Sequence, residues 1–173
     1  GAIHAEVPNR KLVHAWANDL DPSTCLTYIK NICPDNPDSV VCCDVRDLNF
    51  DKLEKIDALA FGFPCNDFSV VGKRAGLNGK YGLLYQFATK ALEKFQPDFF
   101  VAENVRGFAS ANKGFAQRQI LNAFNDVGYK IFPHLYKFEE YGVPQNRHRI
   151  IVVGIRNDIP KTFRPPAPCK NEN

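Results

Sequence analysis

The chain has 173 residues, and its 22 lysines and arginines against 19 aspartates and glutamates give a net charge of +3. Hydrophobic residues make up 45% and charged residues 24%, which is the composition of an ordinary globular domain with a sizeable core. No stretch approaches the ~20 apolar residues of a membrane span, and no signal peptide pattern is present. Membrane and secreted classes of protein are therefore excluded.

The six cysteines are spaced neither for zinc nor for a disulfide framework. None belongs to a Cys-x-x-Cys pair, and no histidine cluster accompanies them. A chain with this much apolar content does not need disulfides, so we expect a reducing, intracellular compartment. Cys25, Cys33, Cys42 and Cys43 fall in helix and strand patterns and are expected to be structural.

The first third of the chain alternates short apolar runs with one helical pattern. Short strands are predicted at residues 12–17, 40–43 and 56–61. A helix is predicted to begin after Asp21, because aspartate is a good N-cap and Pro22 suits the first turn, and to end before Pro34. Residues 62–80 form a long glycine-containing loop, and loops of that length are usually functional or disordered.

Two further helices are predicted after this loop. Apolar residues at spacings of three and four between Leu84 and Phe95 give the strongest helix pattern, which Pro97 ends. The second helix covers residues 115–127, and Gly128 closes it. Further strands are predicted at residues 99–102, 129–138 and 150–155. This alternation favours an α/β fold with a mainly parallel sheet.

Three polar positions follow predicted strands, where open α/β sheets bind their ligands. Asp19 follows the first strand, Cys65 the third, and Glu103 the strand at residues 99–102. Taken singly, each is more commonly structural: a small buried thiol, a helix cap or a solvated strand end. Together at one edge of a sheet, they predict a crevice shared by a thiol and a carboxylate.

Three sequence blocks carry a family resemblance. They are Gly62-Phe63-Pro64-Cys65-Asn66-Asp67-Phe68-Ser69, Glu103-Asn104-Val105 and Gln145-Asn146-Arg147-His148-Arg149. In this order and spacing they resemble the Pro-Cys loop, the Glu-Asn-Val motif and the Gln-x-Arg-x-Arg motif of cytosine-5 DNA methyltransferases of the bacterial restriction-modification type. Weaker matches are Asn18-Asp19-Leu20-Asp21, Asp44-Val45, Gly72-Lys73 and Gly82-Leu83-Leu84-Tyr85. The resemblance therefore covers nearly the whole chain.

The resemblance implies a covalent mechanism at carbon 5 of cytosine in DNA. Carbon 5 is a poor nucleophile, and a thiolate that adds to carbon 6 makes it electron-rich. The resemblance gives this role to Cys65, and to Glu103 the role of acid at ring nitrogen 3. Arg149 resembles the arginine that contacts the base carbonyl, and its charge would favour the Cys65 thiolate. Arg147 is expected to support the loop; ordinary surface ion pairing is the alternative for both arginines.

A base inside a duplex is out of reach of such chemistry, so double-stranded DNA is expected to bind with the target base flipped out. The loop after Cys65 would close over it, with four residues contacting the DNA backbone: Ser69, Lys73, Arg74 and Lys80. The alternative is an exposed loop with three ordinary cations.

The methyl donor implied by the resemblance is S-adenosylmethionine. Asp19 resembles the acidic residue that binds the ribose hydroxyls. Asp44 and Val45 would lie at the adenine and Leu84 near the amino-acid end of the donor. Pro64 is expected to contact the donor as well as to place Cys65.

The implied fold is the Rossmann-like sheet of S-adenosylmethionine-dependent methyltransferases, with helices on both faces. The family opens with a strand and a Phe-x-Gly-x-Gly-Gly turn, and no such sequence is present. The chain also begins with Gly1 and has no methionine, so we expect a piece of a longer protein. Residues 1–156 are interpreted as a partial catalytic domain and residues 157–173 as a proline-rich linker toward an absent target-recognition region. A second chain or segment would supply the missing parts.

Two classes of function are open at this point. One is a fragment or split subunit of an active DNA methyltransferase, located in the cytoplasm and at the nucleoid of a bacterium, or in the nucleus of a eukaryote. The other is a non-catalytic methyltransferase-like module that binds nucleic acid or a partner. Within the enzyme class, transfer RNA is a rival substrate, because family members that act on it share the chemistry.

Overall fold

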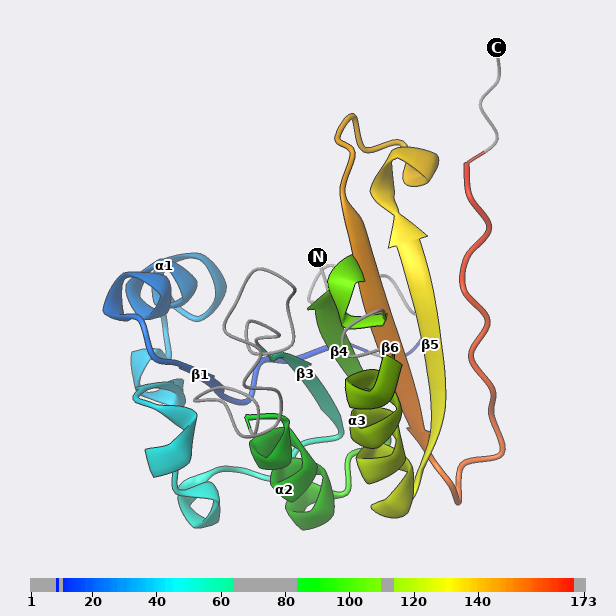
Figure 1. Cartoon of the computed structure of the whole chain (residues 1–173). Coiled ribbons are helices and arrows are strands. Elements are labelled where there is room, and N and C mark those ends of the chain that lie inside the picture. The colour runs from blue at the N-terminus through cyan, green and yellow to red at the C-terminus, as the bar shows by residue number, and fades with distance from the viewer. Residues whose placement is uncertain (1–8, 10, 64–83, 110–113, 170–173) are drawn as a thin grey trace. The chain divides into compact units, whose positions relative to one another are not determined.

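The computed structural model describes residue 9 and residues 11–63, 84–109 and 114–169 (Figure 1). The chain divides into two compact units, Gly1–Lys55 and Ile56–Asn173, and each is described by itself. Six of the predicted site residues lie outside the described residues: Pro64, Cys65, Ser69, Lys73, Arg74 and Lys80.

Unit 1 is built on a short parallel pair of strands joined by a helix. Strand β1 (Ala17–Asp19) pairs with β2 (Val40–Cys42), and α1 (Pro22–Ile32) connects them. Three short helical turns lie around β2: η2 (Pro37–Ser39) precedes it, and η3 (Val45–Asp47) and η4 (Phe50–Lys52) follow it.

The start of α1 is as predicted, and the start of β1 is not. The Asp21 carboxylate accepts a hydrogen bond of 2.7 Å from the Thr24 backbone N–H, which caps the helix. The predicted strand at residues 12–17 forms only from Ala17, because β2 begins at Val40, the partner of Ala17. Before this point the chain makes side-chain contacts instead, such as the hydrogen bond of 3.1 Å from the Trp16 indole to the Glu54 carbonyl.

Unit 2 contains a four-stranded sheet in the order β3-β4-β6-β5. Its strands are β3 (Ala58–Gly62), β4 (Phe99–Val105), β5 (Tyr129–Lys137) and β6 (His148–Arg156). Strands β3 and β4 are parallel, whereas β6 is antiparallel to both β4 and β5. The sheet is therefore mixed rather than mainly parallel. A short connection through η9 (Phe138–Tyr141) joins β5 to β6, and only antiparallel strands can be joined without a long crossover.

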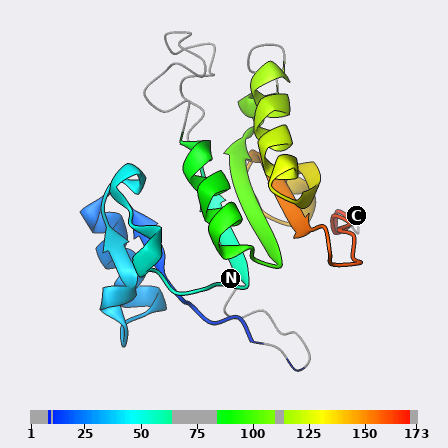
Figure 2. The same cartoon turned by 90° about the horizontal axis from the view of Figure 1, so that it is seen from below.

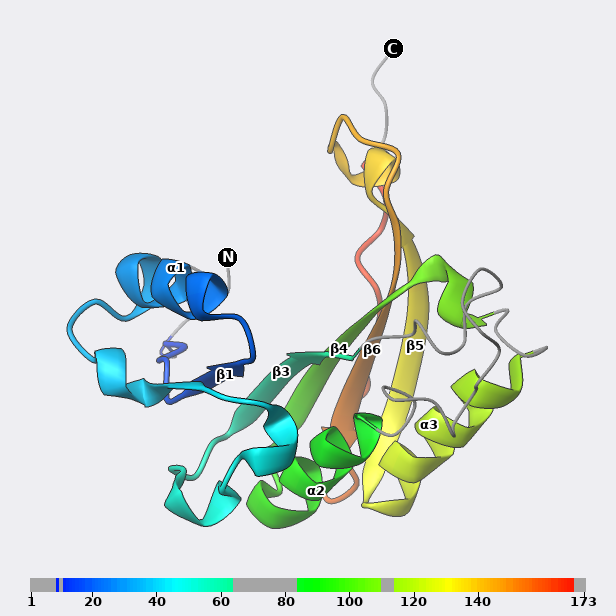
Figure 3. The same ribbon diagram turned by 60° about the vertical axis from the view of Figure 1, so that its left-hand side comes forward.

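Helices α2 (Tyr85–Phe95) and α3 (Phe115–Asp126) lie side by side on one face of this sheet (Figures 2 and 3). Both match their predicted spans to within a residue or two. The core between helices and sheet is largely aromatic and includes Leu92, Phe100, Phe108, Ile120, Phe124, Tyr129 and Val152. Phe108 comes from η7 (Arg106–Ala109), which follows β4 directly and covers the end of the sheet.

Gly154 of β6 lies directly opposite Phe100 of β4. A Cβ atom added to this glycine would be 2.0 Å from Cε1 of the Phe100 ring, closer than any real contact allows. The Phe100 side chain is fully buried, so its ring has no free space to move into. The aromatic core thus requires glycine at this position.

Residues 157–159 form a turn after β6, and residues 160–169 then run without regular structure beside β5 (Figure 1). The Tyr141 hydroxyl donates to the Pro166 carbonyl at 3.2 Å, and the Cys169 N–H donates to the Glu140 carbonyl at 2.8 Å. These hydrogen bonds hold the proline-rich segment against η9. That this segment links the domain to another region stays a prediction.

Candidate functional site

The Glu103-Asn104-Val105 motif lies within β4, not after it as predicted. The ladder between β4 and β6 continues to the pair Val105–Arg149, so the strand extends three residues beyond the predicted end. Successive residues of a strand point to opposite faces of the sheet. Glu103 and Asn104 therefore act on opposite faces, and Asn104 shares its face with the buried Phe100 and Ala102.

Glu103 and Arg149, from separate motifs, form an ion pair. The register places Glu103 opposite Ile151 and Arg149 opposite Val105, so the two are diagonal neighbours on one face. Arg149 Nε lies 2.6 Å from Glu103 Oε1, and the two side chains are 20% and 46% exposed. The Nε–H does not point along this contact with hydrogen-bond geometry, so the attraction is chiefly one between charges. The Arg149 guanidinium also donates to the His148 carbonyl at 2.8 Å.

Asn104 joins the end of β4 to the segment that leads to Cys65. Its side-chain NH₂ donates a hydrogen bond of 3.0 Å to the Phe63 carbonyl, and its Oδ1 accepts one of 2.8 Å from the Val105 N–H. The backbone ladder between β3 and β4 ends at the pair Gly62–Glu103, so the Asn104 amide extends it by one residue. Asn104 is only 3% exposed.

The sequence argument gave Asn104 no role, although a signal was present. Phe100, Ala102 and Asn104 alternate along β4 on the buried face, and an amide at such a position requires hydrogen-bond partners. The partner turns out to be the residue immediately before Pro64. Asn104 is thus the positioning residue that the motif comparison alone did not identify.

Arg147 lies in the exposed connection between η9 and β6. Its carbonyl accepts a hydrogen bond of 3.0 Å from the Phe138 N–H, which fixes the backbone at this point. The expected role of its side chain in supporting the Cys65 loop stays a prediction.

In unit 1, Asp19 is the last residue of β1 rather than a residue after the strand, and Asp44 follows β2, so both lie at the carboxyl end of this parallel pair. Asp19 is exposed, and its Oδ1 accepts a hydrogen bond of 2.9 Å from the Asp21 N–H. The Asp21 carboxyl has a pKa below its usual value, chiefly because of the hydrogen bond from the Thr24 backbone. The network thus fixes the orientation of the Asp19 carboxylate at the edge of this sheet.

The residues predicted to bind the donor fit it to different degrees. Asp19 is exposed and accepts one hydrogen bond at Oδ1, and a carboxylate can accept several, so Asp19 suits a ribose diol. Both oxygens of Asp44 instead contact Arg46, at 2.9 Å to its Nε and 2.5 Å to its Nη2. An adenine amine would have to share Asp44 with this guanidinium. Val45 begins η3, and Leu84 directly precedes α2 in the other unit.

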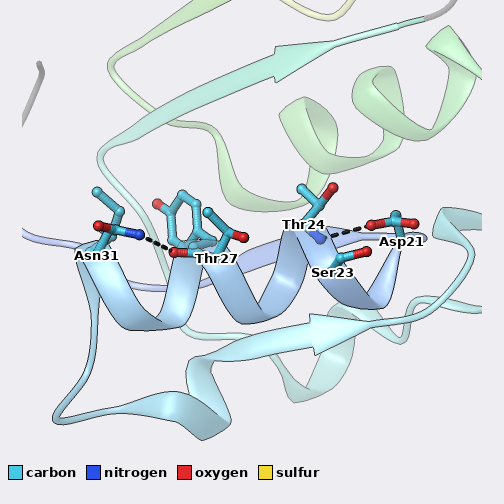
Figure 4. A pocket seen from close by; sticks show the side chains of 7 residues that line it. Asp21, Ser23, Thr24, Thr27 and Asn31 are labelled. Atoms are coloured by element: carbon cyan, nitrogen blue, oxygen red, sulfur yellow. Dashed lines mark hydrogen bonds between the residues drawn. The ribbon is translucent and has the colours of Figure 1, made fainter.

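A surface depression in unit 1 lies away from these residues (Figure 4). It is lined by Asp21, Ser23, Thr24, Thr27, Tyr28, Asn31 and Ile32, all from α1 and its N-cap. The hydrogen bonds drawn there run from the Thr24 N–H to the Asp21 carboxylate and from the Asn31 amide to the Thr27 carbonyl, and both serve the helix itself. Neither Asp19 nor Asp44 lines the depression, and it is not the predicted site.

The sequence matches, over residues 1–173, the family model described as C-5 cytosine-specific DNA methylase. The chain belongs to this family. It is 55% identical over 166 residues to the type II methyltransferase M.BbvI of Brevibacillus brevis, which covers 92% of this chain and 44% of that protein. It is 40% identical over 159 residues to the type II methyltransferase M.NgoFVII of Neisseria gonorrhoeae, covering 91% of this chain and 41% of that protein. The chain spans less than half the length of these curated relatives.

The fold comparison agrees with the family assignment. The structure of the Entamoeba histolytica methyltransferase EhMeth superposes with a TM-score of 0.65 at 15% identity, covering 90% of this chain and 48% of that chain. The predicted methyltransferase fold is thereby confirmed. Of the predicted catalytic residues of this cytosine methylase domain, the structure brings Glu103 and Arg149 into contact. Asp19 and Asp44 lie at one edge of the two-stranded sheet of unit 1, whereas Glu103 and Arg149 belong to unit 2.

Proposed function

We propose that this chain is the part of a cytosine-5 DNA methyltransferase that performs the chemical step: transfer of a methyl group from S-adenosylmethionine to carbon 5 of cytosine through a covalent adduct at Cys65. The observation that carries the proposal is the contact between Glu103 and Arg149, two residues of separate motifs that have complementary tasks at one pyrimidine. Family membership and the printed names of the relatives support the same reaction.

In the proposed mechanism, the Cys65 thiolate forms a bond to carbon 6 of the cytosine. The electron pair of the 5,6 double bond shifts to the bond between carbons 5 and 4, and Glu103 gives or shares a proton at ring nitrogen 3. Carbon 5, made electron-rich in this way, would take up the electrophilic methyl group that S-adenosylmethionine supplies when bound. A base from solvent would remove the proton from carbon 5, the thiolate would leave carbon 6, and the proton at ring nitrogen 3 would return to Glu103, which restores the 5,6 double bond and frees Cys65.

Arg149 has two tasks in this proposal. Its guanidinium holds the Glu103 carboxyl group beside the base, and it is placed to donate a hydrogen bond to the base carbonyl. Because Nε lies near Glu103 without an aligned hydrogen bond, the pair can rearrange around a base at small cost. Arg147 would support the neighbouring backbone.

S-adenosylmethionine supplies an electrophilic methyl group on a sulfonium. We propose that Asp19 binds its ribose hydroxyls, since the carboxylate is exposed and already oriented by the Asp21 N–H. Asp44 and Val45 would contact the adenine, with Asp44 shared between adenine and Arg46. Pro64 and Leu84 would contact the rest of the donor.

The proposed substrate is double-stranded DNA with the target cytosine flipped out. Ser69, Lys73, Arg74 and Lys80 would contact the backbone of the strand that carries it. Because the relatives are more than twice as long, we further propose that a second segment or chain supplies a glycine-rich turn and a target-recognition region. Residues 1–156 then form part of the catalytic domain, and residues 157–173 lead toward the recognition region.

The test is a chimera in which this chain replaces the matching segment of M.BbvI. It is mixed with S-adenosylmethionine and duplex DNA that carries 5-fluorocytosine, from which fluorine cannot leave as a cation. Intact mass and peptide mapping are expected to show an adduct at Cys65, which Cys65→Ser abolishes and the control Cys169→Ser does not. Glu103→Gln is expected to slow its formation by about 10²-fold or more. A folded chimera without an adduct, or an adduct at another cysteine, would contradict the proposal.

A further inference from the structure

His148 lies between a guanidinium and a carboxylate at the same end of the four-stranded sheet. Its Nε2 is 2.6 Å from Oε1 of Glu139, and its Nδ1 is 3.3 Å from Nη1 of Arg106. The three side chains come from three segments: Arg106 from η7 after β4, Glu139 from η9 after β5, and His148 from the first residue of β6. The family motifs give His148 no role.

The partners define one protonation state of the imidazole. A guanidinium only donates hydrogen bonds and a carboxylate only accepts them. Nδ1 must therefore accept from Arg106, and Nε2 must carry the hydrogen that is donated to Glu139. This is the neutral imidazole with its hydrogen on Nε2. A protonated ring would still bind Glu139, but its Nδ1–H would face the donors of Arg106 and the contact with Arg106 would be lost.

The surroundings of His148 are rich in positive charge. Lys137 lies opposite His148 in the β5–β6 ladder, and Arg147 and Arg149 precede and follow it in the chain. The carboxylates on this side are Glu139 and Glu140, and Glu140 is paired with Lys137 at 2.8 Å. His148 therefore contacts one carboxylate and one guanidinium, in surroundings where Glu140 already has a lysine partner.

The contact between Arg106 and His148 continues the junction of β4 and β6. The backbone ladder ends at the pair Val105–Arg149, and Arg106 and His148 are the next residues on the two strands. The His148 carbonyl in turn accepts a hydrogen bond of 2.8 Å from the Arg149 guanidinium. Whatever fixes His148 therefore also fixes the backbone to which Arg149 is bound.

We propose that His148 is a positioning residue: its imidazole joins η7 and η9 to the start of β6 and so holds Arg149 beside Glu103. The catalytic consequence rests on the proposed function, whereas the structural part does not. Loss of the imidazole is expected to loosen the Arg149–Glu103 pair, so the rate of methyl transfer should fall when an apolar residue replaces His148.

The structural part is tested by nuclear magnetic resonance on this chain. Long-range proton–nitrogen correlation at mildly alkaline pH is expected to show His148 as the neutral ring with its hydrogen on Nε2. His148→Leu is expected to shift the Nε–Hε signal of Arg149, whereas His148→Gln, which can make both hydrogen bonds, is expected to leave it near its original position. A hydrogen on Nδ1, or an Arg149 signal indifferent to His148, would overturn the proposal whether or not the chain is an enzyme.

The catalytic part is tested by the steady-state kinetics of the M.BbvI chimera. His148→Leu, which can neither accept from Arg106 nor donate to Glu139, should lower kcat about 10-fold with KM for the donor unchanged. A glutamine can make both hydrogen bonds, so His148→Gln should recover most of this loss. His134→Leu, on β5 beside Tyr136, is the matched control and should leave kcat unchanged.

An unchanged kcat in the His148→Leu chimera would refute the catalytic part. If the unaltered chimera forms no methylated DNA, the proposed function fails. The Nε–Hε signal of Arg149 then still shows whether His148 positions the Arg149 side chain.

Discussion

Replacement of Asn104 by leucine tests whether one side chain anchors the segment that carries the proposed nucleophile. Leucine has the same branched shape and number of heavy atoms as asparagine, so Asn104→Leu removes the amide without opening a cavity. The Phe63 carbonyl loses its 3.0 Å hydrogen bond and the Val105 N–H its 2.8 Å acceptor, in surroundings where Asn104 is 3% exposed. Each buried group left without a partner costs about 1–3 kcal/mol, and two groups lose one here. The added apolar burial offsets part of their combined cost, so we expect a net destabilisation of about 1–3 kcal/mol.

Urea denaturation followed by circular dichroism measures this free energy of unfolding. The matched control is Asn122→Leu on the exposed side of α3, which should change the stability by less than about 0.5 kcal/mol. Hydrogen exchange distinguishes anchoring of the segment from general destabilisation. If Asn104 anchors the end of β3, protection should fall first at residues 60–63 and 103–106, by roughly 5- to 150-fold. An Asn104→Leu variant as stable as the control, or a loss of protection spread evenly over unit 2, would refute the reasoning.

Three further predictions concern packing and ionisation. Gly154→Ala should destabilise the chain by about 1–3 kcal/mol in the same denaturation assay, since its Cβ would overlap a buried ring, whereas Gly107→Ala, with nothing within 4 Å of the added atom, should be near neutral. Burial raises the pKa of Tyr129 to about 12, above the value of about 10 in an unfolded chain. Its contribution to stability is therefore complete below pH ~10 and lost as the pH rises through 12, so ultraviolet titration should show Tyr129 ionising together with unfolding. Burial likewise raises the pKa of Cys25 to about 11, so iodoacetamide should modify the exposed Cys169 first, and the reverse order would contradict the assigned burial.

The helices were predictable because their signals are local. Asp21 and Pro22 mark the start of α1, and the apolar spacing from Leu84 to Phe95 defines α2. Each signal depends on neighbours within one or two turns, and none requires knowledge of the rest of the chain. The same holds for the candidate residues Glu103 and Arg149, which their motifs identify one by one.

The extent and direction of the strands were not predictable in the same way. β4 continues to Val105 because β6 pairs with it as far as Arg149. No feature of residues 103–105 themselves predicts this pairing. β1 starts at Ala17 for the converse reason, since β2 begins opposite that residue. Only ten residues connect β5 to β6, so the two strands must be antiparallel if they are neighbours in the sheet. That they are neighbours could not be predicted from the connection alone. Strand ends are properties of pairs of strands.

The longer β4 changes how the proposed site is assembled. Had the strand ended at Ala102, Glu103 and Asn104 would belong to a loop, and their side chains would take directions set by that loop. Within the strand, the pleat sends Glu103 to the face of Arg149 and Asn104 to the buried face, where it holds the Phe63 carbonyl. The same two residues of backbone thus orient both the carboxyl group and the segment leading to Cys65. A shift of register by one residue would exchange their faces, burying the carboxylate and exposing the amide. The Glu103–Arg149 and Asn104–Phe63 contacts would both be lost. The orientation of these two side chains therefore depends on the pairing of β4 with β3 on one side and β6 on the other.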